Sequence, residues 1–200
     1  MKGRVVPVLT ADNADDAVRA CEAILAGGLS SVEITFRTDA AVEAIRRASQ
    51  LDGLIVGAGT VLSESQLAAA VDAGAQFAVA PSTNEAVVRA AHQFGIEVVP
   101  GAATPTEIDR ARALGCHVVK IFPASTLGGP AFIKAVAAVF PDVEFVPTGG
   151  VNPENLGDYL ALPSVLACGG TWICEPALLR DGRFDEVERR ARETASVLAA

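Results

Sequence analysis

Short apolar segments recur along this 200-residue chain, and each is followed by a segment with the periodicity of an amphipathic helix. Between the first two segments, Val18, Cys21 and Leu25 share one face of a predicted helix, because residues three or four apart lie on the same side. The centres of the predicted strands lie 20 to 27 residues apart, at Val5, Val32, Ile55, Phe77, Val98, Val119, Phe145 and Val165. Eight strand–helix units of this length predict an α/β fold with a parallel sheet.

Glycines and capping residues mark the expected ends of the helices. We expect helices to end at Gly27-Gly28, Gly74, Gly95 and Gly115 and to begin after Ser63, Asn84, Thr106 and Asn152-Pro153. Such units form either an open doubly wound sheet or a closed (β/α)8 TIM barrel. The even spacing and the count of eight favour the barrel. Because no linker or low-complexity segment interrupts the pattern, we expect a single domain over residues 1–200.

The composition argues against several classes of protein. Half of the residues are hydrophobic, yet no apolar run approaches the about 20 residues that a membrane helix needs. No targeting signal is recognisable, so we expect a cytoplasmic protein without a membrane partner. The net charge of −8 argues against a nucleic-acid partner. His92 and His117 lack metal-ligand spacing, so no metal is expected, and Cys21, Cys116, Cys168 and Cys174 are predicted to be buried free thiols.

Lysine is rare in this chain, and one copy interrupts a predicted buried strand. Lys2 is near the terminus and Lys134 fits the polar side of a helix, whereas Lys120 lies inside the apolar residues 118–123. Burial removes the hydration of an ammonium group and favours the neutral amine, which can attack a ketone and form a Schiff base. Lys120 is therefore a candidate nucleophile. The alternative is a structural lysine whose head group reaches the surface.

The second predicted strand carries charges on one of its two faces. Side chains alternate along a strand, so Glu33, Thr35 and Arg37 share the face opposite Val32, Ile34 and Phe36. In a parallel barrel that face points inside or towards the mouth, where active sites lie. A buried ion pair between Glu33 and Arg37 is one explanation. A carboxylate and a guanidinium that belong to a catalytic site are the other.

Glycine-rich turns follow three of the predicted strands. Residues 57–60 contain two glycines, which allow a ligand to approach the backbone, and they end in Thr60, which adds a hydroxyl. Gly149-Gly150 and Gly169-Gly170 follow the last two strands. Backbone N–H groups in such turns form nests for anions, and these two positions of a barrel commonly hold phosphate. We therefore expect a phosphate site there.

Together these residues resemble the class I aldolases that cleave 2-keto-3-deoxy-6-phosphogluconate (KDPG). The most specific matches are residues 32–38 (VEITFRT), 56–62 (VGAGTVL), 120–124 (KIFPA) and 147–150 (PTGG), and the likeness covers essentially the whole chain. The resemblance implies a (β/α)8 barrel, a homotrimer, a phosphorylated keto acid as substrate, and no metal or other cofactor. Members often carry a helix before the first strand, whereas here the first predicted strand begins almost at once.

The resemblance also implies roles for individual residues. Lys120 corresponds to the Schiff-base lysine and Glu33 to the general acid/base. The pyruvate part of the substrate would contact Lys120 together with Arg37, Thr60, Pro81, Phe122 and Thr148. The phosphate would contact Gly149, Gly150, Gly169, Gly170 and Thr171.

The same residues also allow other functions. Sister aldolases act on the phosphogalactonate epimer or on 4-hydroxy-2-oxoglutarate, and Thr148 favours the gluconate substrate because an apolar residue is usual there in the galactonate enzymes. A phosphate-binding barrel without catalytic activity would not need Lys120, Glu33 and Arg37 together. An isomerase or synthase on the same fold would use the late glycine turns but not the lysine.

Overall fold

Strands and helices alternate along the computed structural model, which describes residues 4–199. The strands are β1 (Val5–Leu9), β2 (Ser31–Thr35), β3 (Ile55–Gly59), β4 (Phe77–Val79), β5 (Glu97–Val99), β6 (Gly101–Ala102), β7 (Val118–Ile121), β8 (Glu144–Pro147) and β9 (Cys168–Gly170). The helices are α1 (Ala14–Ala26), α2 (Ala41–Ala48), α3 (Glu64–Asp72), α4 (Glu85–Phe94), α5 (Pro105–Ala113), α6 (Gly129–Ala137), α7 (Leu156–Leu160), α8 (Pro176–Arg180) and α9 (Phe184–Ala199). Lys2 lies outside the described residues.

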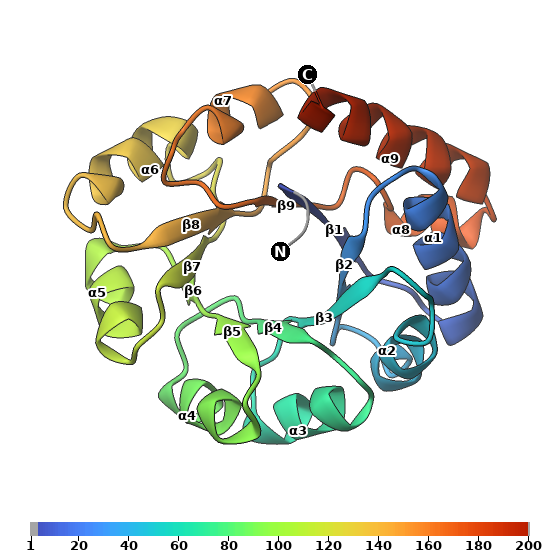
Figure 1. Cartoon of the computed structure of the whole chain (residues 1–200), viewed down its shortest axis with the longest axis horizontal. Helices are drawn as coiled ribbons and strands as arrows, with labels where there is room; N and C mark the ends of the chain where they lie inside the picture. The colour runs from blue at the N-terminus through green and yellow to red at the C-terminus, as the bar shows by residue number, and fades with distance from the viewer. Residues whose placement is uncertain (1–3, 200) are drawn as a thin grey trace.

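The strands pair in parallel and form a strongly curled sheet. A six-stranded part has the order β5-β4-β3-β2-β1-β9, and a three-stranded part has the order β6-β7-β8. Isolated bridges join Phe145 to Val165 and Thr148 to Gly169, next to β8 and β9. Only Pro100 separates β5 from β6, because proline has no N–H to donate to the ladder. Figure 1 shows the strands around the centre with the helices outside them, which confirms the predicted parallel α/β fold.

Three predicted boundaries are wrong. The last strand lies at Cys168–Gly170, not around Val165, which ends a turn through the bond from its N–H to the carbonyl of Leu162 at 3.0 Å. Helix α5 begins after Thr104, where Thr104 and Glu107 form a capping box. Helix α7 begins after Asn155, because reciprocal bonds between Asn152 and Asn155 hold the preceding residues in a turn. Ser63 and Asn84 are helix caps, as predicted.

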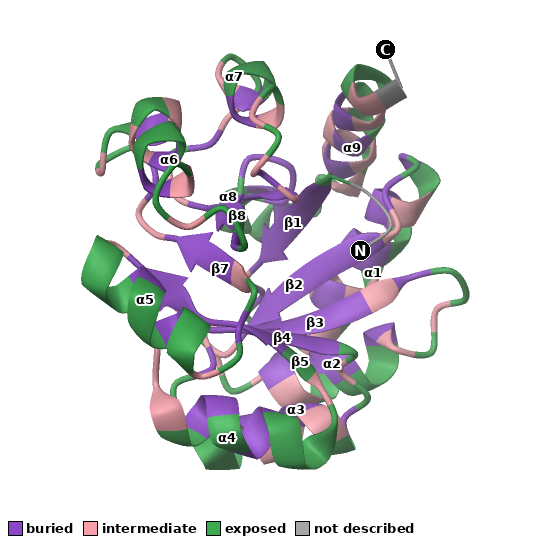
Figure 2. Cartoon of the chain, turned by 60° about the vertical axis from the view of Figure 1, so that its left-hand side comes forward, coloured by how far each residue is buried: buried purple, intermediate pink, exposed green. Residues whose placement is uncertain are grey.

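Two apolar clusters lie on the two faces of the curled sheet. The larger one fills the space between the strands and the helices, and it includes Val32, Ile34 and Ile121. The smaller one consists of Val6, Phe77, Val79, Val99, Val146 and Ala167. Figure 2 shows buried residues along the strands and exposed residues on the outer faces of the helices. The inner face of the sheet is therefore a packed core, and polar side chains on that face need a specific reason.

The four cysteines are free and buried, as predicted. Burial raises the pKa of the Cys21 thiol and of the Cys168 thiol to about 12, so both remain protonated at neutral pH. Within residues 4–199, no group of three or more metal-ligating side chains comes together. Among the same residues, no helix combines the length and apolar character that crossing a membrane requires.

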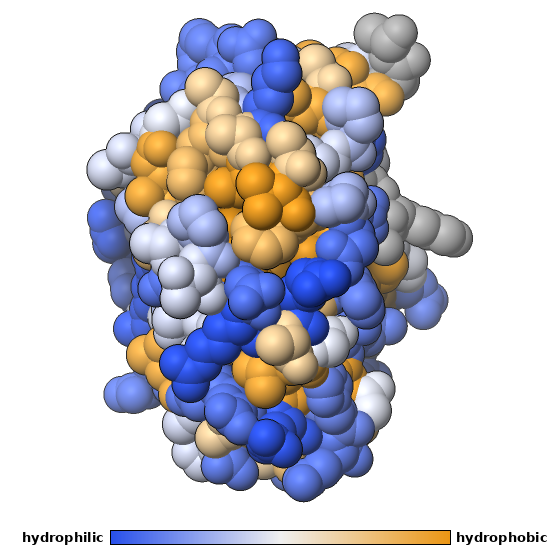
Figure 3. Space-filling view, turned by 90° about the vertical axis from the view of Figure 1, so that its left-hand side faces the viewer, coloured by the Kyte–Doolittle hydropathy of each residue, from blue (hydrophilic) through white to orange (hydrophobic). Residues whose placement is uncertain are grey.

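Several large apolar side chains are exposed on the outer surface. Leu62, Phe94, Val139 and Val197 are each about half exposed or more. Figure 3 shows apolar residues gathered on one face of the molecule, beside a band of strongly polar residues. Apolar patches of this kind often mark contacts with other proteins.

Candidate active site

A cavity of about 230 Å³ opens where the carboxyl ends of the strands meet. Parallel strands bring these ends together, so residues far apart in the sequence become neighbours. The lining residues are Val8, Arg37, Thr60, Pro81, Lys120, Phe122, Thr148, Gly149, Gly150, Val151, Gly170 and Thr171. The cavity thus brings together every site residue predicted from the sequence except Glu33 and Gly169, which lie directly behind its wall. Val8 and Val151 are lining residues that sequence reasoning missed, because neither has a polar side chain.

Lys120 points into the interior of the curled sheet. It is the third residue of β7, and β6 and β8 hold it by pairing it with Gly101 and Val146. Its side chain is only 7% exposed, and its Nζ lies 3.6 Å from Oε1 of Glu33 and 5.4 Å from the centre of the Phe122 ring. The alternative of a lysine whose head group reaches the surface is therefore wrong.

Glu33 supplies the counter-charge of Lys120 from the middle of β2. The 3.6 Å separation is longer than a hydrogen bond, and Oε1 of Glu33 has no hydrogen-bond partner among the described residues. A buried acceptor without a partner costs about 1–3 kcal/mol, and a buried ion pair adds little stability over apolar packing. The pair is therefore poorly explained as a stabilising element, and the free oxygen of Glu33 can accept a hydrogen bond from a bound molecule.

Glycines in β3 make room for the carboxylate of Glu33. A Cβ atom added to Gly59 would lie 2.2 Å from Oε1 of Glu33, and one added to Gly57 would lie 2.2 Å from the ring of Phe77. Both glycines therefore face protein side chains. The interpretation from the sequence, in which these glycines admit a ligand to the backbone, is wrong for both positions.

Arg37 stands at the mouth of the cavity, two residues after β2. The side chain is exposed, and it makes no hydrogen bond or ion pair within residues 4–199. The ion pair between Glu33 and Arg37 considered from the sequence is therefore wrong, because Lys120 takes the place of Arg37. An unpaired guanidinium at a cavity mouth can bind a carboxylate through two parallel hydrogen bonds.

Thr60 is the only described non-glycine residue with a positive φ, at 57°. It follows β3 directly and lines the cavity. A β-branched residue in this left-handed conformation costs about 1–2 kcal/mol, which persists when the surrounding structure imposes it. Strain at a cavity wall therefore points to a role for the side chain.

Thr60→Gly is expected to separate stability from binding. Glycine adopts a positive φ without strain, so the free energy of unfolding should stay within about 1 kcal/mol of the original value despite the added flexibility of the unfolded chain. The resemblance implies that the hydroxyl contacts pyruvate, so its loss should lower the affinity for pyruvate roughly fivefold or more. Thermal unfolding and pyruvate titration measure the two effects. A large drop in stability with unchanged affinity would contradict the assignment.

The turns after β8 and β9 form the other end of the cavity. Gly149 and Gly150 have φ values of 92° and 78°, which favour glycine. Within the described residues, the N–H groups of Gly149, Gly150, Val151 and Thr171 make no hydrogen bond. Gly169 does not line the cavity, and a Cβ atom there would lie 2.5 Å from Oγ1 of Thr148. Oγ1 of Thr148 is buried without a partner among the same residues. Free N–H donors on glycine turns suit an anion.

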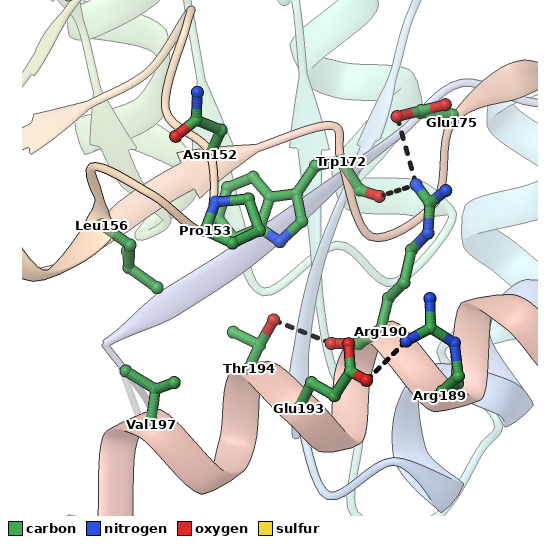
Figure 4. Close-up of a pocket in the computed structure, with 10 residues that line it drawn as sticks. All are labelled: Asn152, Pro153, Leu156, Trp172, Glu175, Arg189, Arg190, Glu193, Thr194 and Val197. Atoms are coloured by element: carbon green, nitrogen blue, oxygen red, sulfur yellow. Dashed lines mark hydrogen bonds and ion pairs between the residues drawn. The ribbon is translucent and has the colours of Figure 1, made fainter.

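A larger cavity of about 420 Å³ lies outside the sheet, between α9 and the segments that follow β8 and β9. Figure 4 shows its charged residues already paired. Nη1 of Arg190 donates to the carbonyl of Trp172 and lies 3.1 Å from Oε1 of Glu175, and Arg189 pairs with Glu193. The cations of this cavity are neutralised, and it lacks the buried amine of the smaller one. The smaller cavity is therefore the candidate active site.

Known proteins resemble this chain over nearly its full length. The family model described as KDPG and KHG aldolase matches residues 1–190. The 2-dehydro-3-deoxy-phosphogluconate aldolase of Treponema pallidum is 43% identical over 98% of this chain and 93% of its own. The KHG/KDPG aldolase of Escherichia coli is 43% identical over 96% of this chain and 90% of its own. A KDPG aldolase of Legionella pneumophila, solved with pyruvate captured as a covalent carbinolamine, matches with a TM-score of 0.92 at 33% identity, over 96% of this chain and 94% of its own.

The curled parallel sheet, the buried amine and these matches place the protein in the class of aldolases, which are lyases. The chain belongs to the KDPG and KHG aldolase family.

Proposed function

We propose that this chain is a Schiff-base aldolase that cleaves KDPG to pyruvate and glyceraldehyde 3-phosphate. One observation carries the proposal: Nζ of Lys120 is buried in a cavity and lies 3.6 Å from the carboxylate of Glu33. The names of the relatives from T. pallidum and E. coli, and the carbinolamine captured in the L. pneumophila enzyme, support the same chemistry.

Lys120 and Glu33 divide the covalent and proton-transfer work in this proposal. The neutral amine of Lys120 attacks the ketone carbon, and the carbinolamine that forms takes up a proton from solvent and loses water, which leaves a cationic imine that accepts electrons. Glu33 takes the proton of the neighbouring hydroxyl, directly or through a water molecule. The carbon–carbon bond then breaks and releases the aldehyde, while its electron pair forms an enamine. Protonation of the enamine and hydrolysis of the imine release pyruvate and restore the amine.

The two ends of the cavity would hold the two anionic ends of the substrate. Arg37 and Thr60 bind the carboxylate, next to Pro81, Phe122 and Thr148. The free N–H groups of Gly149, Gly150 and Thr171 bind the phosphate, together with Gly170. Because both ends are anchored, the scissile bond is held between Lys120 and Glu33. Such orientation of the reacting groups lowers the activation barrier.

The choice of substrate is tested by comparing turnover. We expect the highest kcat/KM with KDPG, a lower value with the phosphogalactonate epimer, and a value at least about tenfold lower with 4-hydroxy-2-oxoglutarate, which lacks the phosphate. Coupled detection of pyruvate measures all three. Faster cleavage of either alternative substrate would contradict KDPG as the preferred substrate and identify the protein as the corresponding sister aldolase.

The sheet is proposed to close as an eight-stranded (β/α)8 barrel within a single domain. The bridges between Phe145 and Val165 and between Thr148 and Gly169, and the continuity of β5 with β6, support closure. A homotrimer, as the resemblance implies, is supported by the apolar face in Figure 3. Light scattering of the purified protein would test the trimer. The cytoplasmic location stays a prediction from the sequence.

A further inference from the structure

Asn155 contacts the glycine turn from outside the cavity. It precedes α7, but its side chain makes no capping bond to that helix. Instead, Nδ2 of Asn155 donates to the carbonyl of Gly150 at 2.9 Å, and Oδ1 accepts the N–H of Asn152 at 3.0 Å. Oδ1 of Asn152 accepts the N–H of Asn155 in return, also at 3.0 Å. One amide side chain therefore holds both ends of the segment from Gly150 to Asn152.

The carbonyl groups of the turn are bonded on the side away from the free N–H groups. The carbonyl of Gly149 accepts the N–H of Ser125 at 3.0 Å, and the carbonyl of Gly150 accepts Nδ2 of Asn155. In a trans peptide the N–H points opposite to the preceding C=O. The N–H groups of Gly150 and Val151 therefore point away from Ser125 and Asn155, and both residues line the cavity.

Ser125 closes the turn from the other side. A Cβ atom at Gly150 would lie 2.4 Å from Oγ of Ser125, which itself lies 3.4 Å from the hydroxyl of Tyr159. The turn cannot move towards Ser125 without a clash. Among the described residues, Asn155 is the side chain that prevents the carbonyl of Gly150 from rotating, because no other donor bonds that oxygen.

We infer that Asn155 is a positioning residue for phosphate: it fixes the peptide plane between Gly150 and Val151, so that the N–H of Val151 stays directed at the anion beside the N–H of Gly150, whose peptide Ser125 holds. This inference rests on the proposed function, and it makes Asn155 a determinant of the preference for phosphorylated over unphosphorylated keto acids. Asn155 does not itself touch the substrate, and the covalent chemistry at Lys120 does not depend on it.

The test compares Asn155→Ala and Asn155→Ser with the unchanged protein on KDPG and on its unphosphorylated counterpart. Without the donor the Gly150 peptide can rotate, so kcat/KM for KDPG should fall about tenfold, mainly through KM, as for loss of an oriented anion contact. The value for the unphosphorylated substrate should change less than about twofold. Binding of inorganic phosphate, measured by calorimetry, should weaken to the same extent as KM rises.

Asn84→Ala is the matched control. Asn84 also bonds a distant carbonyl, that of Leu62, through Nδ2 and accepts an N–H through Oδ1, but it does not line the cavity. The Asn84→Ala variant should leave the ratio of the two kcat/KM values unchanged.

Equal losses on both substrates in the Asn155 variants, or unchanged phosphate binding, would overturn the inference. If the unchanged protein formed no borohydride-reducible adduct with pyruvate, the proposed function would fail, while phosphate binding would still decide the role of Asn155.

Discussion

Lys120→Met is expected to abolish turnover, with a loss of roughly 10⁴-fold or more, because no other described side chain offers an amine inside the cavity. Incubation with pyruvate followed by borohydride reduction should attach the keto acid to the peptide that contains Lys120 in the unchanged protein. The same treatment should leave the variant unmodified. Peptide mass spectrometry locates the adduct.

The surroundings of Lys120 also predict a change in stability. Lys120→Met removes the counter-charge of Glu33 and leaves a buried carboxylate, which destabilises by about 3–5 kcal/mol. The double variant Lys120→Met/Glu33→Gln removes both charges and should recover much of that loss. Thermal unfolding of the single and double variants measures the coupling. Lys134→Met, on the exposed side of α6, serves as control and should retain both activity and stability.

An adduct on any other peptide would refute the role of Lys120. So would an adduct of normal yield in Lys120→Met. In Lys120→Met, loss of activity without loss of the adduct cannot arise from this mechanism, because the adduct forms on the amine that this variant lacks.

Glu33→Gln is expected to slow cleavage by about 10²- to 10⁴-fold, the usual contribution of a general acid/base. The amide keeps the shape of the side chain in the space left by Gly59, so the change removes proton transfer rather than packing. Exchange of the methyl protons of pyruvate with solvent should fall in parallel, because enamine formation needs the same base. The adduct at Lys120 should still form, although more slowly.

Both rates can be followed by proton NMR on one sample. Glu64→Gln, an exposed carboxylate in the first turn of α3, is the matched control and should leave them unchanged. Near-normal cleavage and exchange in Glu33→Gln would remove Glu33 from this role.

Much of the site could be predicted before the structure, since residues that are unusual at their positions mark it. A lysine and a glutamate each interrupt an apolar strand, and diglycines follow the last two strands. Periodicity fixes on which face of β2 Glu33 lies, and the parallel order of the strands brings the turns to one end. Boundaries were less certain. Strand β9 reads Cys168-Gly169-Gly170 and lacks the β-branched residues that identify strands.

The sequence could not predict which side chains contact the charged residues and the glycines of the site. The alternation along β2 puts Glu33 and Arg37 on one face, yet the described cation beside Glu33 is Lys120 of β7, at 3.6 Å. Gly59 and Gly169 give space to Glu33 and Thr148, a matter of volumes that no local pattern records. Asn155 resembles an ordinary helix cap in sequence, whereas its amide holds the Gly150 turn.

The sequence by itself determined the order of most strands and helices and the choice of candidate site residues, because periodicity and unusual residues are local properties of the chain. The tertiary structure decided which groups face one another, which glycines admit a neighbouring side chain, and which N–H groups remain free. Those properties depend on distances between strands that are far apart along the chain, and only the closely packed interior sets them.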